Sequence, residues 1–173
     1  MKDEILYTIS IYSENNVGLL NRISAIFLKR HINIESFSTS LSEIKNVFRY
    51  VIVVNTTEEK VKKIVSQIEK QVDVIKAFYH TDKETIFQES ALYKVKSKSL
   101  FEERHIQNII KNSHAKMVTV SPEYFVIEKT GFREDTEKLY NDLAPYGLLQ
   151  FVRSGRISVT KEPMKITEIL NKY

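Results

Sequence analysis

The fold is decided by residues 10–42, which read SIYSENNVGLLNRISAIFLKRHINIESFSTSLS. An apolar strand pattern leads into the polar run ENN at residues 14–16, and apolar residues at helical spacing follow from Leu19 onward. A second strand pattern opens with HINIES at residues 31–36. The stretch therefore predicts strand, helix and strand, joined by a short polar loop in front of the helix.

Gly18 gives this loop the character of a small-ligand site. Glycine at the first turn of a helix lets backbone approach a ligand, and the free N–H groups there suit a carboxylate. Asn15 and Asn33 both carry donor and acceptor atoms, so together they could hold the carboxylate and the ammonium of a free amino acid. A plain Asn cap with a permissive glycine beside it explains the same local pattern, and that alternative stays open.

Six elements follow one another in the first half of the chain. Their order predicts a ferredoxin-like βαββαβ unit of the α+β class, in which an antiparallel sheet carries both helices on one face. Because the other face or an edge strand of so small a unit usually meets a second copy, we expect a dimer. The predicted elements are strand 4–12, helix 18–30, strands 32–42 and 46–55, helix 57–71 with a capping box at Thr56 and Glu59, and strand 72–79.

A second unit repeats this order after a polar segment. The prediction is two ferredoxin-like units, at 1–80 and 90–161, separated by a linker at 81–89 and followed by a tail at 162–173. The tail is expected to be a short helix or only partly ordered. The elements predicted for the second unit are strand 90–97, helix 101–113, strands 115–120 and 123–130, helix 133–144, and two short strands in 147–160 around Ser154 and Gly155.

Composition favours a soluble, cytoplasmic protein. The chain has 173 residues, no cysteine and a formal net charge of +4. No apolar run approaches the roughly 20 residues of a membrane helix, and the first residues do not resemble a signal peptide. Basic residues are interleaved with acidic ones along the whole chain, so we expect no nucleic-acid partner and no membrane partner.

No catalytic motif is present. The histidines show no spacing typical of metal ligands, so no metal site is predicted. The chain also lacks a nucleophile elbow, a phosphate-binding glycine loop and a dinucleotide fingerprint. The histidines are His31, His80, His105 and His114.

The strands predicted at 32–42 and 46–55 each contain one charged residue, Glu35 and Arg49. Arg49 is expected either to face solvent opposite Ser38 or Ser40, or to contact a partner subunit. Glu35 is expected either to block strand addition at an edge or to hold the effector loop or the dimer partner.

The first unit resembles the ACT domain of the small, regulatory subunit of acetolactate synthase (acetohydroxyacid synthase). The resemblance is carried by ENNVGLLNRI at 14–23 and NIES at 33–36. The second unit resembles the C-terminal domain of that family in KV at 94–95, VTVSP at 118–122, TG at 130–131 and RSG at 153–155. Together these matches cover roughly residues 4–160.

The resemblance implies a non-catalytic subunit. Such a subunit activates a separate large catalytic subunit, on which thiamine diphosphate, Mg and FAD are expected, and it confers feedback inhibition by valine or another branched-chain amino acid. ACT domains of the family pair as homodimers and bind the effector at the interface. Carried over by position, the effector-binding residues are Asn15, Gly18, Leu19 and Leu20 of one chain facing Asn33 and Ile34 of its partner.

Two other functions remain open. A free-standing ACT-domain sensor of amino acids could regulate another enzyme or transcription without the catalytic subunit. A purely structural interaction protein would leave the effector site empty.

Overall fold

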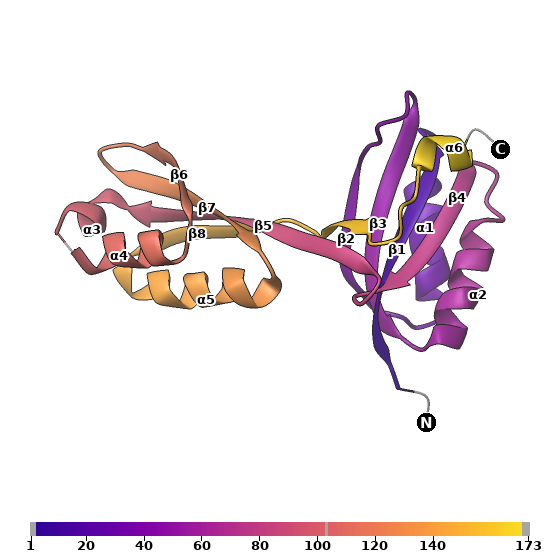
Figure 1. Cartoon of the computed structure of the whole chain (residues 1–173), viewed down its shortest axis with the longest axis horizontal. Coiled ribbons are helices and arrows are strands. Elements are labelled where there is room, and N and C mark those ends of the chain that lie inside the picture. The colour runs from indigo at the N-terminus through magenta and orange to yellow at the C-terminus, as the bar shows by residue number, and fades with distance from the viewer. Residues whose placement is uncertain (1–2, 103, 171–173) are drawn as a thin grey trace. The chain divides into compact units, whose positions relative to one another are not determined.

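The chain folds into two compact units, shown in a computed structural model that describes residues 3–102 and 104–170 (Figure 1). Unit 1 contains the chain up to Phe87 together with the residues from Arg156 onward, and unit 2 is Gln88–Gly155. None of the helices in the described ranges has the length and apolar character that a membrane span requires.

Unit 1 is built on a four-stranded antiparallel sheet with the order β2-β3-β1-β4. This is the strand order of a ferredoxin-like unit, and it confirms the predicted fold class. Figure 1 shows α1 and α2 packed beside this sheet. The elements are β1 (Ile5–Glu14), α1 (Leu19–Leu28), β2 (Ile34–Leu41), β3 (Val47–Thr56), α2 (Glu58–Ile68) and β4 (Val74–Thr81).

The core of unit 1 lies between the sheet and these helices. Ile9 and Ile11 of β1 are fully buried and belong to one cluster with Ile23 and Phe27 of α1 and Ile64 of α2. Burying each such side chain contributes on the order of 1.5–3 kcal/mol, so this layer holds the helices on the sheet.

The N-cap of α2 lies one residue later than predicted. Thr57 is the N-cap, and its side chain accepts a hydrogen bond from the Lys60 N–H at 3.5 Å. Thr56 is the last residue of β3 and is fully buried, so it cannot also cap the helix. The prediction of a capping box at Thr56 and Glu59 was therefore wrong.

Residues 156–170, here called the C-terminal segment, return to unit 1 and lie on the second face of its sheet. The segment contains β9 (Ile157–Thr160), which pairs with β5, and the short helix α6 (Ile166–Leu170). Leu170 packs in a small cluster with Tyr12 and Val47, on the face of β1 opposite Ile9 and Ile11. The segment is drawn in yellow in Figure 1.

Arg156 anchors the start of this segment. Its guanidinium lies 2.6 Å from the Asp82 carboxylate, donates to Thr8 Oγ1 at 3.1 Å, and sits 3.6 Å above the centre of the Phe87 ring. Arg156 is only 7% exposed. A buried arginine with three kinds of partner holds the returning chain against the sheet.

The units therefore differ from the predicted domains of 1–80 and 90–161, since β9 and the segment predicted as a tail belong with unit 1. The predicted linker 81–89 is a tight turn instead. Glu84 closes this turn by accepting from the N–H and the hydroxyl of Thr81, both at 2.7 Å, and β5 begins at Thr85.

Unit 2 repeats the ferredoxin-like order, with strands β6-β7-β5-β8 side by side. Its core contains Tyr93, whose hydroxyl donates to the Thr136 carbonyl at 2.7 Å and whose pKa is raised by burial to about 12. Its elements are β5 (Thr85–Lys96), which starts in unit 1, α3 (Ser97–Glu102), α4 (Arg104–Asn112), β6 (Lys116–Val120), β7 (Tyr124–Gly131), α5 (Arg133–Leu143), the 3₁₀ turn Ala144–Tyr146 and β8 (Leu148–Arg153).

Candidate functional site

The loop before α1 turns on Gly18. This residue is the N-cap of α1, and its φ of 87° lies in the left-handed region that favours glycine. No side chain caps the helix. The Leu19 N–H reaches the Asn16 carbonyl only at 3.4 Å, so the positive end of the helix dipole is left open to an anion.

Asp73, in the turn before β4, fastens the same loop. Its backbone carbonyl accepts from the Glu14 N–H at 2.9 Å, and its carboxylate accepts from Asn16 Nδ2 at 2.6 Å. The carboxylate also forms an ion pair with Arg22 of α1. The hydrogen bonds from Asn16 and Arg22 lower the pKa of Asp73, so the carboxylate stays charged and keeps the loop in place at neutral pH.

The site residues predicted at this end of α1 differ in how exposed they are to a ligand. Asn15 and Gly18 are exposed, and Leu20 is 44% exposed, so all are open to a ligand. Leu19 is fully buried in the core of unit 1. Its side chain therefore packs the helix and is closed to a ligand, and only its backbone lies at the loop.

The remaining predicted residues lie beyond the other end of α1. Asn33 is exposed directly before β2, and Ile34 is partly buried against the core. The ten residues of α1 separate Asn33 from Asn15, which corresponds to a rise of about 15 Å. One chain therefore does not bring Asn15 and Asn33 together, and a site made from both needs a second chain.

Glu35 sits where the edge strand β2 departs from regular pairing. The register between β2 and β3 shifts from Ile34 to Ser36, which leaves Glu35 as the additional residue of a β-bulge. Its side chain is exposed. A charged bulge on an edge strand is a common device against unwanted strand addition, which favours the first of the two expected roles.

Arg49 has a contact that neither expectation included. It lies opposite Ser40 in the strand register, but its guanidinium Nη2 donates to the Ser158 carbonyl at 2.6 Å and lies 3.4 Å from Ser10 Oγ. The C-terminal segment thus covers part of Arg49, which is partly buried. Residue 158 was predicted to belong to the second unit, so nothing in the sequence indicated that it lies on this sheet.

Sequence reasoning also missed Asp73, Arg22 and Asn16 as the group that fastens the loop. The sequence did show Asn16 as a second amide side chain beside Asn15 in the polar run. Its partner lies 57 positions later. No local spacing relates the two residues, so only the folded topology reveals the pair.

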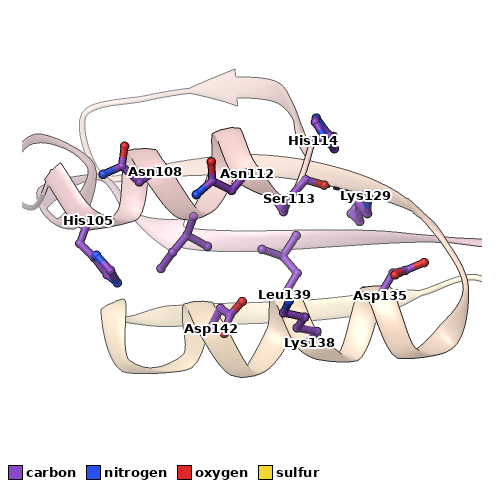
Figure 2. A pocket seen from close by; sticks show the side chains of 11 residues that line it. His105, Asn108, Asn112, Ser113, His114, Lys129, Asp135, Lys138, Leu139 and Asp142 are labelled. Carbon is purple, nitrogen blue, oxygen red and sulfur yellow. Dashed lines mark hydrogen bonds between the residues drawn. The ribbon is translucent and has the colours of Figure 1, made fainter.

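A polar groove lies in unit 2 between α4 and α5, with a volume of about 430 Å³. Figure 2 shows His105 and His114 at its opposite ends, with Asn108 and Asn112 along α4. Lys129 donates to the Ser113 carbonyl at 2.8 Å. Within the ranges that the structure describes, no three His, Asp or Glu side chains gather as a metal site.

Two family models match the chain, one for each half. A model for the ACT domain like that of the AHAS small subunit matches residues 9–76, and a model for the small subunit of acetolactate synthase matches residues 88–162. The matched ranges contain the loop at Gly18 and all of unit 2.

Curated relatives match over most of their length. The acetolactate synthase small subunit of Mycolicibacterium smegmatis is 33% identical over 160 residues, which is 92% of this chain and 94% of that protein. The small subunit of Bacillus subtilis is 37% identical over 142 residues, or 82% of each chain.

A solved structure agrees with these relatives. The crystal structure of the acetolactate synthase small subunit from Thermotoga maritima has a TM-score of 0.81 and 25% sequence identity, and the match covers 92% of this chain and 99% of that one. Family models, curated relatives and a solved structure thus agree over both units, and the chain belongs to the family of acetolactate synthase small subunits.

Proposed function

We propose that this chain is the regulatory subunit of an acetolactate synthase. It would activate a separate, larger catalytic subunit that carries thiamine diphosphate, Mg and FAD, and it would have no catalytic role itself. Membership of the small-subunit family over both units supports this proposal. A small subunit by its name has a larger catalytic partner.

The effector would be valine or another branched-chain amino acid, bound at the loop before α1. The observation that carries this assignment is the exposed helix end at Gly18, which no side chain caps. Backbone N–H groups there would take the carboxylate, and the side-chain oxygen of Asn15 would accept from the ammonium. The exposed Leu20 side chain would contact the aliphatic group.

A second copy of the chain would complete this site. Asn33 and Ile34 lie on the far side of α1 from the loop, at the start of the edge strand β2. Two chains that meet at this edge would place Asn33 of one beside Asn15 of the other. The open edge favours such a homodimer, whereas the second face of the sheet is already occupied by the C-terminal segment.

Feedback would then act through a shift between two arrangements of the dimer. An effector bound at the interface stabilises the arrangement to which it binds more tightly, and this changes how the regulatory subunit holds the catalytic one. Because such coupling is reciprocal, the catalytic subunit would in turn change the affinity for the effector.

Reconstitution tests the proposal. The purified chain is mixed with the catalytic subunit from the same organism, and acetolactate formation from pyruvate is measured with and without valine. We expect the chain to stimulate the reaction and valine to reverse the stimulation. Asn15→Ala and Asn33→Ala should raise the valine concentration for half-inhibition at least tenfold and leave the stimulation largely intact, because their side chains would contact only the effector.

Asn108→Ala is the matched control, since this exposed asparagine lies in unit 2 on α4. Stimulation with unchanged inhibition in both test variants would retain the regulatory role and remove the site from this loop. No stimulation at all would contradict the proposed function and favour a free-standing amino-acid sensor.

A further inference from the structure

A second cavity lies in unit 1, between the C-terminal segment and the sheet face that the segment covers. It has a volume of about 380 Å³. Its floor comes from β1, β3 and β4 and includes Tyr12, Arg49 and Phe78, while Met164 and Ile166 of the C-terminal segment contribute its other wall. None of the residues assigned to the effector loop lines it.

Arg49 gives this cavity its chemical character. Its guanidinium has a hydrogen bond to the Ser158 carbonyl and a longer contact with Ser10 Oγ, and it lies 5.9 Å from the centre of the Tyr12 ring. Among the described residues no carboxylate forms an ion pair with it. Its Nε is buried and has no hydrogen-bond partner.

The Arg49 guanidinium thus has no anionic partner among the described residues. The guanidinium presents five N–H donors in a planar fork that matches a carboxylate, and an unsatisfied buried donor costs free energy. Arg156, which lies under the same segment, has the Asp82 carboxylate as its partner. Arg49 has no carboxylate partner among the described residues, and it lines the cavity.

The rest of the lining determines what else a ligand needs. Phe78 and Met164 are partly buried and Tyr12 is almost fully buried, so they offer apolar and aromatic surface. Two carboxylates also line the cavity, those of Glu43 and Glu162, but both residues are exposed to solvent. The buried and partly buried lining thus combines the Arg49 guanidinium with aromatic and apolar surface.

We propose that this cavity binds a small carboxylate with an apolar body. The carboxylate accepts hydrogen bonds from the Arg49 guanidinium, and the apolar body packs against Tyr12, Phe78 and Met164. This site is separate from the effector loop and does not depend on the proposed function. Since the C-terminal segment forms one wall, an occupied site also holds that segment on the sheet.

Methionine NMR tests the proposal on the full chain. The sequence contains three methionines, and among them Met164 lines the cavity while Met117 lies on β6 of unit 2. The chain is labelled with ¹³C at the methionine methyl groups and titrated with 3-phenylpropanoate. We expect a saturable shift of the Met164 resonance and none of Met117. The neutral amide, 3-phenylpropanamide, has the same apolar body and should bind at least tenfold more weakly.

Arg49→Gln should weaken binding of 3-phenylpropanoate at least tenfold, and Arg49→Lys should weaken it less because it keeps the charge and loses the fork. Arg30→Gln is the matched control. Arg30 also has a buried Nε without a partner, but its side chain bonds to Gln67 on α2. Arg30→Gln should bind like the wild type.

Several results would overturn the proposal. Equal binding of the acid and the amide would show that Arg49 contributes no recognition. Binding unchanged in Arg49→Gln, or a shift confined to Met117, would place the ligand elsewhere. Loss of binding in Asn15→Ala would assign it to the effector loop. If Arg49→Gln fails to fold, Arg49→Lys and the comparison of acid with amide still decide the outcome.

Discussion

At the scale of single residues, the loop before α1 depends on one glycine and one distant carboxylate. Gly18 supplies a backbone conformation that most L-residues adopt only at a cost of about 1–2 kcal/mol. A Cβ at this position would meet no atom within 4 Å. A substitution there therefore acts through the backbone conformation and through whatever the new side chain brings to the open helix end.

Gly18→Asp and Gly18→Asn form a matched pair at this position, because both residues tolerate the left-handed conformation and differ in charge. In the reconstituted enzyme, Gly18→Asp should raise the valine concentration for half-inhibition at least tenfold, because its carboxylate repels that of the effector. Gly18→Asn should change inhibition much less. Both should still bind the catalytic subunit in a pull-down, and lost association in both would show that Gly18 is chiefly structural.

Asp73 should make the stability of unit 1 depend on pH. Its pKa is lowered from the ordinary value of 3.8 by the hydrogen bonds from Asn16 and Arg22. The stability that it contributes is therefore present above pH 3.8 and is lost as the pH falls through the lowered pKa.

Asp73→Asn should consequently be less stable than the wild type near neutral pH, and this difference should shrink at lower pH. Urea unfolding at several pH values between 2 and 7 measures it, with Asp142→Asn in unit 2 as the control. A difference that stays constant across this range would show that the charge of Asp73 does not fasten the loop.

Residue-scale prediction from the sequence succeeded where the signal was local. The position of Gly18 at the start of a helix followed from its place between a polar run and an apolar helix, and its positive φ agrees with that position. The role of Asp73 as a loop anchor and the contact of Arg49 with the C-terminal segment were missed, because the partners of both residues lie far away along the chain. Arg49 and Ser158 are 109 positions apart. Periodicity carries no information about such pairs.

At the scale of elements, the spacing of apolar residues predicted nearly every helix and strand. Burial of one face makes apolar residues alternate along a strand and recur every three or four residues along a helix. The predictions were wrong where a hydrogen bond of a polar side chain determines where a helix or strand begins. Thr57 rather than Thr56 caps α2, and the Glu84 carboxylate closes a turn in what was predicted to be a linker.

The C-terminal segment is the element whose role was least predictable, and Arg156 should account for much of its attachment. Arg156→Gln removes the ion pair with Asp82 and the stacking on Phe87, and it should lower the free energy of unfolding of unit 1 by about 2 kcal/mol. Thermal or urea unfolding measures the loss. Arg133→Gln, an exposed position in unit 2, should have little effect, and equal losses in both variants would contradict the anchoring role.

At the scale of the whole molecule, the sequence predicted that the same strand order occurs twice. It did not predict that the chain returns to unit 1 after unit 2. Two ferredoxin-like units follow from the order of elements in each half. The apolar pattern does not indicate that residues 156–170 return to unit 1, since the strand β9 would show the same alternation on either unit. Unit 2 is thus inserted into unit 1, and the Arg156 guanidinium lies on the ring of Phe87 at the two points of insertion.

Excision of unit 2 tests this organisation. A variant in which a short Gly-Ser linker joins Phe87 to Arg156 should fold cooperatively, because the ends to be joined already lie close together. It should melt at a higher temperature than a variant truncated after Phe87, which lacks the C-terminal segment. Circular dichroism on heating compares them, and identical melting temperatures would mean that the segment adds nothing to unit 1.

The returning segment also imposes an order on synthesis. A ribosome makes the chain up to Phe87 first and then all of unit 2 before it reaches Arg156. During that interval the nascent unit 1 has its helices on one side of the sheet and an uncovered surface, including Tyr12 and Phe78, on the other. Unit 2 can complete its own core before unit 1 does, so the half of the chain that begins to fold first is the one that finishes last.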